Sequence, residues 1–245
     1  MRTKHQIDII KNSFSDPYLV DNFINQNEIE HLINLFETDI GEGTDPSQKK
    51  VYKNTGPVTL DIKKYLTDPV VNDIIHRIRM SIGDFDITAG FFFFTNYPHI
   101  IHNDDLFGLP DNVYKAITIP LRLDSDEEIT DFSNLCLFDQ HYFHGPSKFF
   151  KNSEDIPTYY NKCVYDYRRI DGLVETDAIS DEVYQQYFTH LNREWLEGLS
   201  LHSVFQWKPG TCMIFDSLRL HCASDFRKHG IKSKLGLSIF TKMRN

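Results

Sequence analysis

An imidazole and a carboxylate two positions apart are the first chemically suggestive pair in this sequence. His102 and Asp104 lie in the segment HIIHND, residues 99–104, whose composition predicts a short strand. Because side chains alternate between the two faces of a strand, His102 and Asp104 project to one side, and His99 and Asp105 to the other. An isolated H-x-D pair fits a solvated turn equally well, so the motif needs support from elsewhere in the chain.

Two later segments also carry chemically capable side chains. His221 follows an apolar strand that comes directly after a Pro-Gly turn. On the last predicted strand, Lys232 and Lys234 alternate with apolar residues. If that strand lines the inside of a barrel, a buried ammonium group requires an anionic partner.

The three signals together are more specific than each alone. Two imidazoles and one carboxylate on a rigid sheet form the facial triad of non-haem Fe(II) oxygenases. Such a triad leaves coordination positions open, and a 2-oxo acid and O₂ can occupy them. The far carboxylate of the 2-oxo acid then needs a cation on a neighbouring strand, which a lysine supplies.

On these residues the sequence resembles the Fe(II)/2-oxoglutarate-dependent oxygenase superfamily, near its phytanoyl-CoA hydroxylase-like and prolyl-4-hydroxylase-like branches. The family pattern is H-x-D, then a distant His, then a later Arg or Lys. In this chain the pattern falls on His102, Asp104, His221 and Lys234. The segment WKPGTCMIFDSLRLHCAS, residues 207–224, is also similar to the family's segment around its distal histidine.

The resemblance implies that His102, Asp104 and His221 bind Fe(II) and act as the catalytic centre. It also implies that Lys234 pairs with the C5 carboxylate of 2-oxoglutarate. Members often carry Arg at the anchoring position, followed two residues later by Ser, whereas here Lys is followed by Gly. This departure leaves Lys232 as an alternative anchor and Arg227 as a third candidate.

Two residues just before the H-x-D segment are further candidates for binding the cosubstrate. Asn96 and Tyr97 stand where family members often place a hydrogen-bonding residue. The resemblance therefore implies that these two side chains help to hold the carboxylates of 2-oxoglutarate.

The implied reaction is hydroxylation of an unactivated C–H bond in a small molecule or a peptidyl residue, with release of succinate and CO₂. Its cofactors are Fe(II), 2-oxoglutarate as cosubstrate and O₂. Asp104 favours hydroxylation or a related C–H oxidation over halogenation, because related halogenases replace this carboxylate with a small residue. Two alternatives stay open: a cupin-type metalloenzyme that does not use 2-oxoglutarate, and a non-catalytic barrel that acts as a binding module.

The elements that position these side chains follow from periodicity and capping signals. Asn25 and Glu28 resemble a capping box at the start of a helix, and Asp68 before Pro opens a second helix that Gly83 can end. A third helix is predicted over residues 180–198, with apolar residues along one face. Strands are predicted at 18–23, 84–97, 99–104, 114–123, 135–140, 203–207, 211–216 and 234–241.

This order of elements argues against a doubly wound α/β fold, in which strands and helices would alternate. It favours a mainly β domain with helices packed on one side. The resemblance implies a double-stranded β-helix (jelly-roll, cupin-like) buttressed by the N-terminal helices. We expect one domain over residues 1–245, with a partly helical insertion at about 141–200 that either covers the mouth of the site or only decorates it.

Composition limits the class of partners. The 245 residues contain 35 acidic and 26 basic side chains, a formal net charge of −9, which disfavours broad contact with nucleic acid or an anionic membrane. No apolar run approaches the roughly 18 residues of a membrane span. The spacing of the 4 cysteines, which form no CxxC pair, excludes a zinc ribbon, and their number is too small for a disulfide scaffold of this size. We expect a cytoplasmic monomer or homodimer that acts on a small-molecule or peptidyl substrate.

Overall fold

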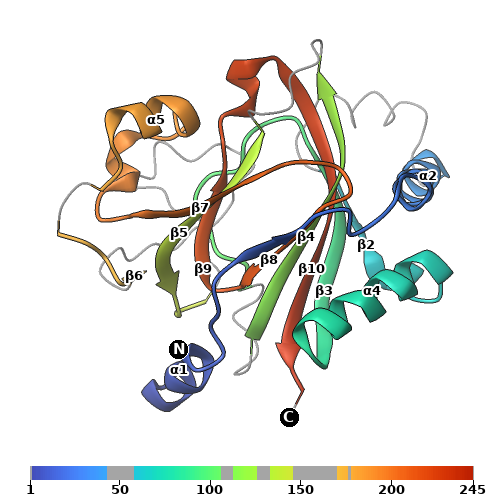
Figure 1. The fold of residues 1–245 in the computed structure, drawn as a ribbon, viewed down its shortest axis with the longest axis horizontal. Helices are drawn as coiled ribbons and strands as arrows, with labels where there is room; N and C mark the ends of the chain where they lie inside the picture. Colours follow the sequence, from blue (N-terminus) through green and yellow to red (C-terminus); the bar gives the residue numbers. More distant parts are fainter. Residues whose placement is uncertain are drawn as a thin grey trace.

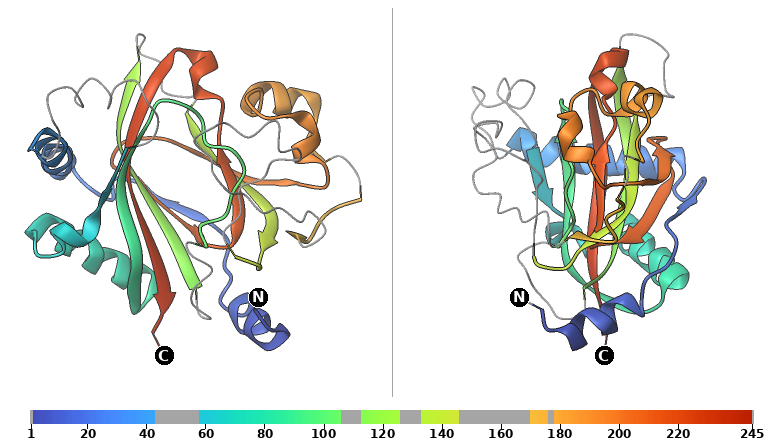
Figure 2. Two further views of the ribbon diagram at one scale, coloured as in Figure 1. Left: turned by 180° about the vertical axis from the view of Figure 1, so that it is seen from behind. Right: turned by 90° about the vertical axis from the view of Figure 1, so that its left-hand side faces the viewer.

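Two antiparallel β-sheets face each other, and helices cover their outer sides (Figure 1). The computed structural model describes residues 2–42, 58–105, 113–125, 133–145, 170–175 and 178–244. Both termini lie at the same end of the molecule (Figure 2). In the described part of the chain, no helix has both the length and the apolar character needed to cross a membrane.

The larger sheet has six strands and the smaller sheet has four. In spatial order the larger sheet consists of β1 (Tyr18–Val20), β8 (Cys212–Asp216), β4 (Val113–Ser125), β10 (Ile231–Met243), β3 (Phe85–Thr95) and β2 (Val58–Asp61). The smaller sheet contains β6 (Ile170–Asp171), β5 (Asn134–Tyr142), β7 (Leu201–Gln206) and β9 (Arg219–Ala223), with β5 paired to all three others. This arrangement confirms the predicted mainly β, jelly-roll architecture.

Three apolar layers hold the sheets and helices together. The helices α2 (Gln26–Glu42) and α4 (Pro69–Ile82) pack on the outer face of the larger sheet, and α5 (Asp181–Tyr187) packs outside the smaller one (Figures 1 and 2). A further cluster fills the space between the two sheets and includes Trp207 and Phe215. The alternation of a strand divides the run of four phenylalanines between layers. Phe92 and Phe94 are buried towards the helices, and Phe91 and Phe93 are half-buried on the inner face.

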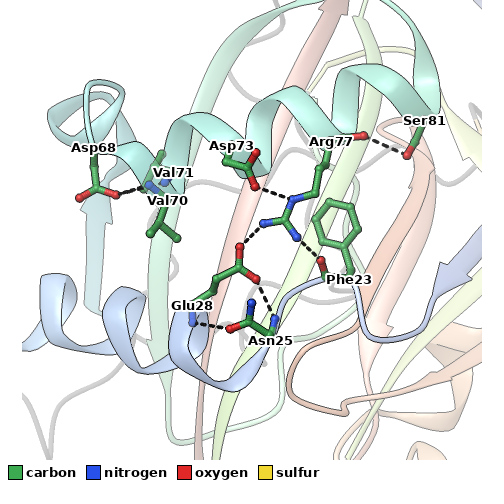
Figure 3. A network of polar contacts seen from close by, with 9 residues as sticks. All are labelled: Phe23, Asn25, Glu28, Asp68, Val70, Val71, Asp73, Arg77 and Ser81. Carbon is green, nitrogen blue, oxygen red and sulfur yellow. Dashed lines mark hydrogen bonds and ion pairs between the residues drawn. The ribbon is translucent and has the colours of Figure 1, made fainter.

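The predicted helix starts at Asn25 and Asp68 are confirmed. The Asn25 side chain accepts the backbone N–H of Glu28 at 3.1 Å, and the Glu28 carboxylate accepts that of Asn25 at 2.8 Å. The Asp68 carboxylate accepts the N–H groups of Val70 and Val71 at the start of α4 (Figure 3). These caps satisfy backbone donors that the first turn of each helix would otherwise leave unpaired.

Arg77 ties α4 to the start of α2 (Figure 3). Its guanidinium donates to the Glu28 carboxylate and to the carbonyl of Phe23, and its Nε lies 2.9 Å from the Asp73 carboxylate one turn earlier. Because these partners come from both helical segments, this one side chain fixes how the two helices lie against the larger sheet.

Three predicted elements differ from the structure. The segment 99–104 is not a strand, and within it only His102 forms an isolated bridge, to His221. The predicted strand 18–23 is limited to β1, because the following residues turn to bury Phe23 and Ile24. The predicted helix 180–198 ends at Tyr187, because Thr189 donates to Asp225 at 2.6 Å and draws the chain away from the helix axis.

The apolar residues of that third segment still belong to the core. Leu191 and Trp195 are buried outside the smaller sheet, where a short 3-10 helix at Arg193–Leu196 replaces the last helical turns. The predicted insertion at 141–200 lies partly outside the described residues, which exclude 146–169 and 176–177. Strand β5 runs to Tyr142, so the described part of the insertion begins after that residue.

The sequence patterns missed one α-helix and three strands: α1 (Lys4–Lys11), β2, β6 and β9. A signal for α1 was present, because Thr3 and Gln6 form a complete capping box at its start. Strands β2 and β9 have four and five residues, and such short runs carry too little periodicity to identify.

Replacing Arg77 with alanine should destabilise the fold by removing the tie between α2 and α4. We expect the free energy of unfolding to fall by about 2 kcal/mol, because a hydrogen bond to a charged group contributes about 1.5–3 kcal/mol. Urea denaturation measures this change. The control is Lys242→Ala, whose ion pair with Asp86 is exposed and should contribute no more than about 0.5 kcal/mol. Equal losses in both variants would contradict the structural role of Arg77.

Candidate metal centre

The fold brings His221 next to His102 and Asp104, which lie more than a hundred residues earlier in the sequence. His221 Nε2 lies 3.3 Å from one Asp104 carboxylate oxygen, and His102 Nε2 lies 3.9 Å from the other. The two imidazole rings have centroids 4.2 Å apart. One donor atom from each of the three residues falls within 4.8 Å of the other two. In the described part of the chain this is the one group of three such residues with metal-binding spacing.

Backbone hydrogen bonds to β9 and to the β8–β9 turn set this geometry. The N–H of His102 donates to the carbonyl of His221 and the N–H of His221 donates to the carbonyl of His102, both at 2.9 Å. Two positions further on, the N–H of Asp104 donates to the carbonyl of Ser217 at 2.8 Å. The segment before Asp104 therefore runs antiparallel along β9 although it forms no regular strand. His221 lies at the centre of β9, rather than beyond the end of a strand.

Each histidine has one ring nitrogen engaged by the backbone and the other directed towards the cluster. Nδ1 of His102 donates to the carbonyl of Ile100 at 2.7 Å, and Nδ1 of His221 donates to the carbonyl of Arg219 at 2.9 Å. A carbonyl partner fixes the proton on Nδ1, so Nε2 carries the lone pair. Both imidazoles thus point a metal-binding atom at Asp104.

Burial and charge favour the protonation states that a metal needs. Burial lowers the pKa of His102 well below its ordinary value, and the neighbouring His221 adds to this effect. Burial acts to raise the pKa of Asp104. The charge interaction and the hydrogen bond with His221 outweigh this effect, so the pKa of the carboxyl is lowered. Over the neutral pH range, His102 therefore offers a neutral imidazole and Asp104 an ionised carboxylate.

The donor set fits a divalent first-row metal ion. Two nitrogens and one oxygen on one side match the facial triad that non-haem Fe(II) uses. Donors about 2 Å from a shared ion lie at most about 4 Å apart, so binding an ion requires only a small inward movement of these side chains. His102 and Asp104 are mostly buried, with 17% and 12% of the side chain exposed.

The structure separates the two candidate lysines. Pairing of β10 with β4 shifts register between Ile231 and Ser233, so Lys232 is an extra residue that falls outside the ladder and is exposed. Lys234 lies on the inner face of β10 and is only 4% exposed. The strict alternation that would place both lysines on one face therefore fails at this bulge.

The ammonium group of Lys234 lies in an aromatic setting. Its Nζ is 4.2 Å from the ring centroid of Trp207 and 5.0 Å from that of Phe226. Among the described residues no carboxylate forms an ion pair with it. Burial lowers the pKa of Lys234 from 10.5 to about 8. Burying a cation without a charged partner costs free energy. An anionic ligand bound next to Lys234 would supply that partner.

Asn96 and Tyr97 lie directly after β3, both half-buried. The Tyr97 ring stacks near that of His99, with centroids 6.2 Å apart, and His99 in turn lies 5.3 Å from His102. Tyr97 also packs against the apolar cluster outside the smaller sheet. Sequence reasoning did not identify Trp207 and Phe226, because only the fold places their rings on Lys234.

Replacing Lys234 with methionine should change how stability depends on pH. The unfolded chain holds the Lys234 proton up to a pKa of 10.5 and the folded chain only up to about 8, so stability should rise with pH across that interval. Between these pH values, we expect the free energy of unfolding of the wild type to rise by up to about 3 kcal/mol relative to that of Lys234→Met. Urea denaturation at a series of pH values measures the difference, and a constant difference would contradict the burial of a charged lysine.

Comparison with known proteins places the fold. No family model and no curated sequence matches this chain. Among solved structures, the non-heme α-ketoglutarate-dependent carbocyclase SnoK from nogalamycin biosynthesis has a TM-score of 0.50 at 8% identity, over 98% of this chain and 84% of that one. The epimerase SnoN, in complex with Fe³⁺, α-ketoglutarate and nogalamycin RO, has a TM-score of 0.48 at 9% identity. The match covers 97% of this chain and 82% of that one. A Pseudomonas putida prolyl-4-hydroxylase gives 0.44 at 10% identity, over 98% of both chains. By its likeness to SnoK, this chain has the jelly-roll fold of the 2-oxoglutarate-dependent enzymes.

Proposed function

We propose that the protein is a non-haem Fe(II)- and 2-oxoglutarate-dependent oxygenase. In this proposal it hydroxylates an unactivated C–H bond of a small molecule or a peptidyl residue and releases succinate and CO₂. The observation that carries the proposal is the convergence of His102, Asp104 and His221, together with a buried ammonium group that has no carboxylate partner among the residues the structure describes.

The triad and the lysine face the same interior. The His221 ring packs edge-on against Phe215 with centroids 4.9 Å apart, and the Lys234 ammonium lies over Trp207. Phe215 and Trp207 both belong to the apolar cluster between the two sheets. A ligand that chelates a metal at the triad and carries a second carboxylate therefore has a cation on the same inner side. 2-Oxoglutarate has this combination of groups.

Each side chain has a defined part in this proposal. When bound, Fe(II) with 2-oxoglutarate and O₂ supplies the oxidising power for C–H chemistry. Nε2 of each histidine and the Asp104 carboxylate hold the ion on one side, and Lys234 orients the cosubstrate through its far carboxylate. The half-buried rings of Phe91 and Phe93 line the inner face of β3 and limit the access of water. SnoK is described as an α-ketoglutarate-dependent enzyme, and use of the same cosubstrate is part of this proposal.

Loss of a triad side chain should abolish metal-dependent turnover. We expect His221→Ala and Asp104→Ala to reduce succinate formation by at least about a hundredfold in the presence of Fe(II), ascorbate and 2-oxoglutarate, because each removes one of three protein ligands. Circular dichroism checks that both variants remain folded. Wild-type protein that binds Fe(II) without decarboxylating 2-oxoglutarate, even with candidate substrates, would favour a binding module. Oxygen consumption that needs metal but no keto acid would favour the cupin-type alternative.

The two lysines on β10 give a matched test of the cosubstrate anchor. We expect Lys234→Ala to raise the KM for 2-oxoglutarate at least about tenfold, because a lost charge-assisted hydrogen bond weakens binding by about 1.5–3 kcal/mol. Lys232→Ala changes the same residue type two positions away, where the side chain is exposed, and should leave the KM within about twofold. Steady-state kinetics with 2-oxoglutarate as the varied component measures both. The opposite ranking would assign the anchor to Lys232.

A further inference from the structure

We infer that Arg2 is a positioning residue for Asp104, acting through the adjacent carboxylate of Asp105. The inference rests on the proposed function, since it concerns how the carboxylate ligand of the proposed metal site is held. Its basis is a buried ion pair between the N-terminal segment and the residue directly after Asp104.

The contact between Arg2 and Asp105 is bidentate and shielded from water. One guanidinium nitrogen donates to Asp105 Oδ2 at 2.6 Å and the other donates to Oδ1 at 3.0 Å. The Arg2 side chain is 6% exposed and that of Asp105 is 0% exposed. A forked pair of this kind fixes both distance and orientation, which a single contact from a lysine would not do.

The residues on both sides of Asp104 are anchored away from the metal site. The Asn103 amide donates to the carbonyls of Tyr142 and Gly145 at 3.0 and 3.2 Å. Arg2 joins Asp105 to the same region, because it also donates to the carbonyl of Phe143 at 3.0 Å. With its two neighbours held on one side, Asp104 is left to project to the other, towards His102 and His221.

Helix α1 keeps Arg2 in place. Arg2 precedes Thr3, whose capping box with Gln6 starts the helix. In its last turn the helix buries Ile10 in a cluster with Val113, Phe143 and Leu218. Beyond the helix, the Phe14 ring stacks on His141 with centroids 4.3 Å apart. These contacts dock the N-terminal segment against the end of β5, where its guanidinium meets Asp105.

Arg2 also determines which of two adjacent carboxylates is offered to the metal. Asp104 and Asp105 are chemically equivalent ligands, and a slip of one residue would exchange their faces. Pairing with Arg2 neutralises Asp105 and holds it in the opposite direction. Loss of Arg2 would leave a buried carboxylate unpaired next to the site, and its charge would favour a change in the backbone that carries Asp104.

The test is Co(II) binding to the full-length protein, with any tag placed at the C-terminus. We expect Arg2→Gln to weaken Co(II) affinity by about 10–100-fold, the range typical for loss of a group that orients a metal ligand. It should also shift the visible d–d absorption of the bound Co(II), because the ligand geometry changes. Arg2→Lys keeps the positive charge without the two-pronged contact, so its Co(II) affinity should lie between those of the wild type and Arg2→Gln. The control is Lys11→Ala, which removes the exposed ion pair of the same N-terminal segment with Asp171 and should leave affinity and spectrum unchanged.

The outcomes separate this inference from the proposed function. If the wild type binds no Co(II), the metal site itself fails. If the wild type binds Co(II) and both Arg2 variants bind it with the same affinity and spectrum, the positioning role of Arg2 fails while the metal site stands. If Arg2→Gln does not fold, the decision falls to Arg2→Lys, whose spectrum must differ from that of the wild type. An effect of Lys11→Ala equal to that of Arg2→Gln would show that docking of α1 matters and that the Asp105 contact does not.

Discussion

A pair of backbone hydrogen bonds between His102 and His221 is the interaction on which the rest of the site depends. These two bonds hold an irregular segment along β9, and they place both imidazoles on the same side. Strand β9 is fixed in turn by its pairing with β5 in the centre of the smaller sheet. Because a sheet is rigid and each bond fixes the register, two residues far apart in the sequence meet to within a few ångströms. The ring nitrogens then point inwards because their Nδ1 partners are carbonyls of the same segments.

A buried charge forms the second constraint. The cation of Lys234 lies against the rings of Trp207 and Phe226, and its lowered pKa reflects the cost of burying the charge there. Gly236, two residues later on the same strand face, makes room for this arrangement. A Cβ atom there would lie 2.7 Å from the Trp207 ring, so a serine at this position would displace the ring that covers the ammonium. Gly236, which departs from the family pattern, therefore leaves room for the Trp207 ring that packs against Lys234.

Several features of the fold could be predicted because they depend on neighbours in the sequence. The caps at Asn25 and Asp68 act within one turn, and the alternation along β3 assigns its four successive phenylalanines to two faces. Prediction failed where distant contacts decide the local structure. The segment 180–198 has a helical apolar stripe, yet its bond from Thr189 to Asp225 ends the helix. Segment 99–104 has the composition of a strand, yet its pairing with β9 amounts to an isolated bridge at His102 and does not extend into a regular ladder.

The sequence alone determined the chemical types at the site: an H-x-D pair, a later histidine and a lysine on an apolar strand, in an order that resembles one enzyme superfamily. It could do so because ligand chemistry resides in side-chain type and order. Only the tertiary structure decided which lysine is buried, because a bulge at Lys232 breaks the alternation that periodicity assumes. Only the tertiary structure revealed the contact between Arg2 and Asp105, because no pattern within either segment encodes a partner so far away along the chain.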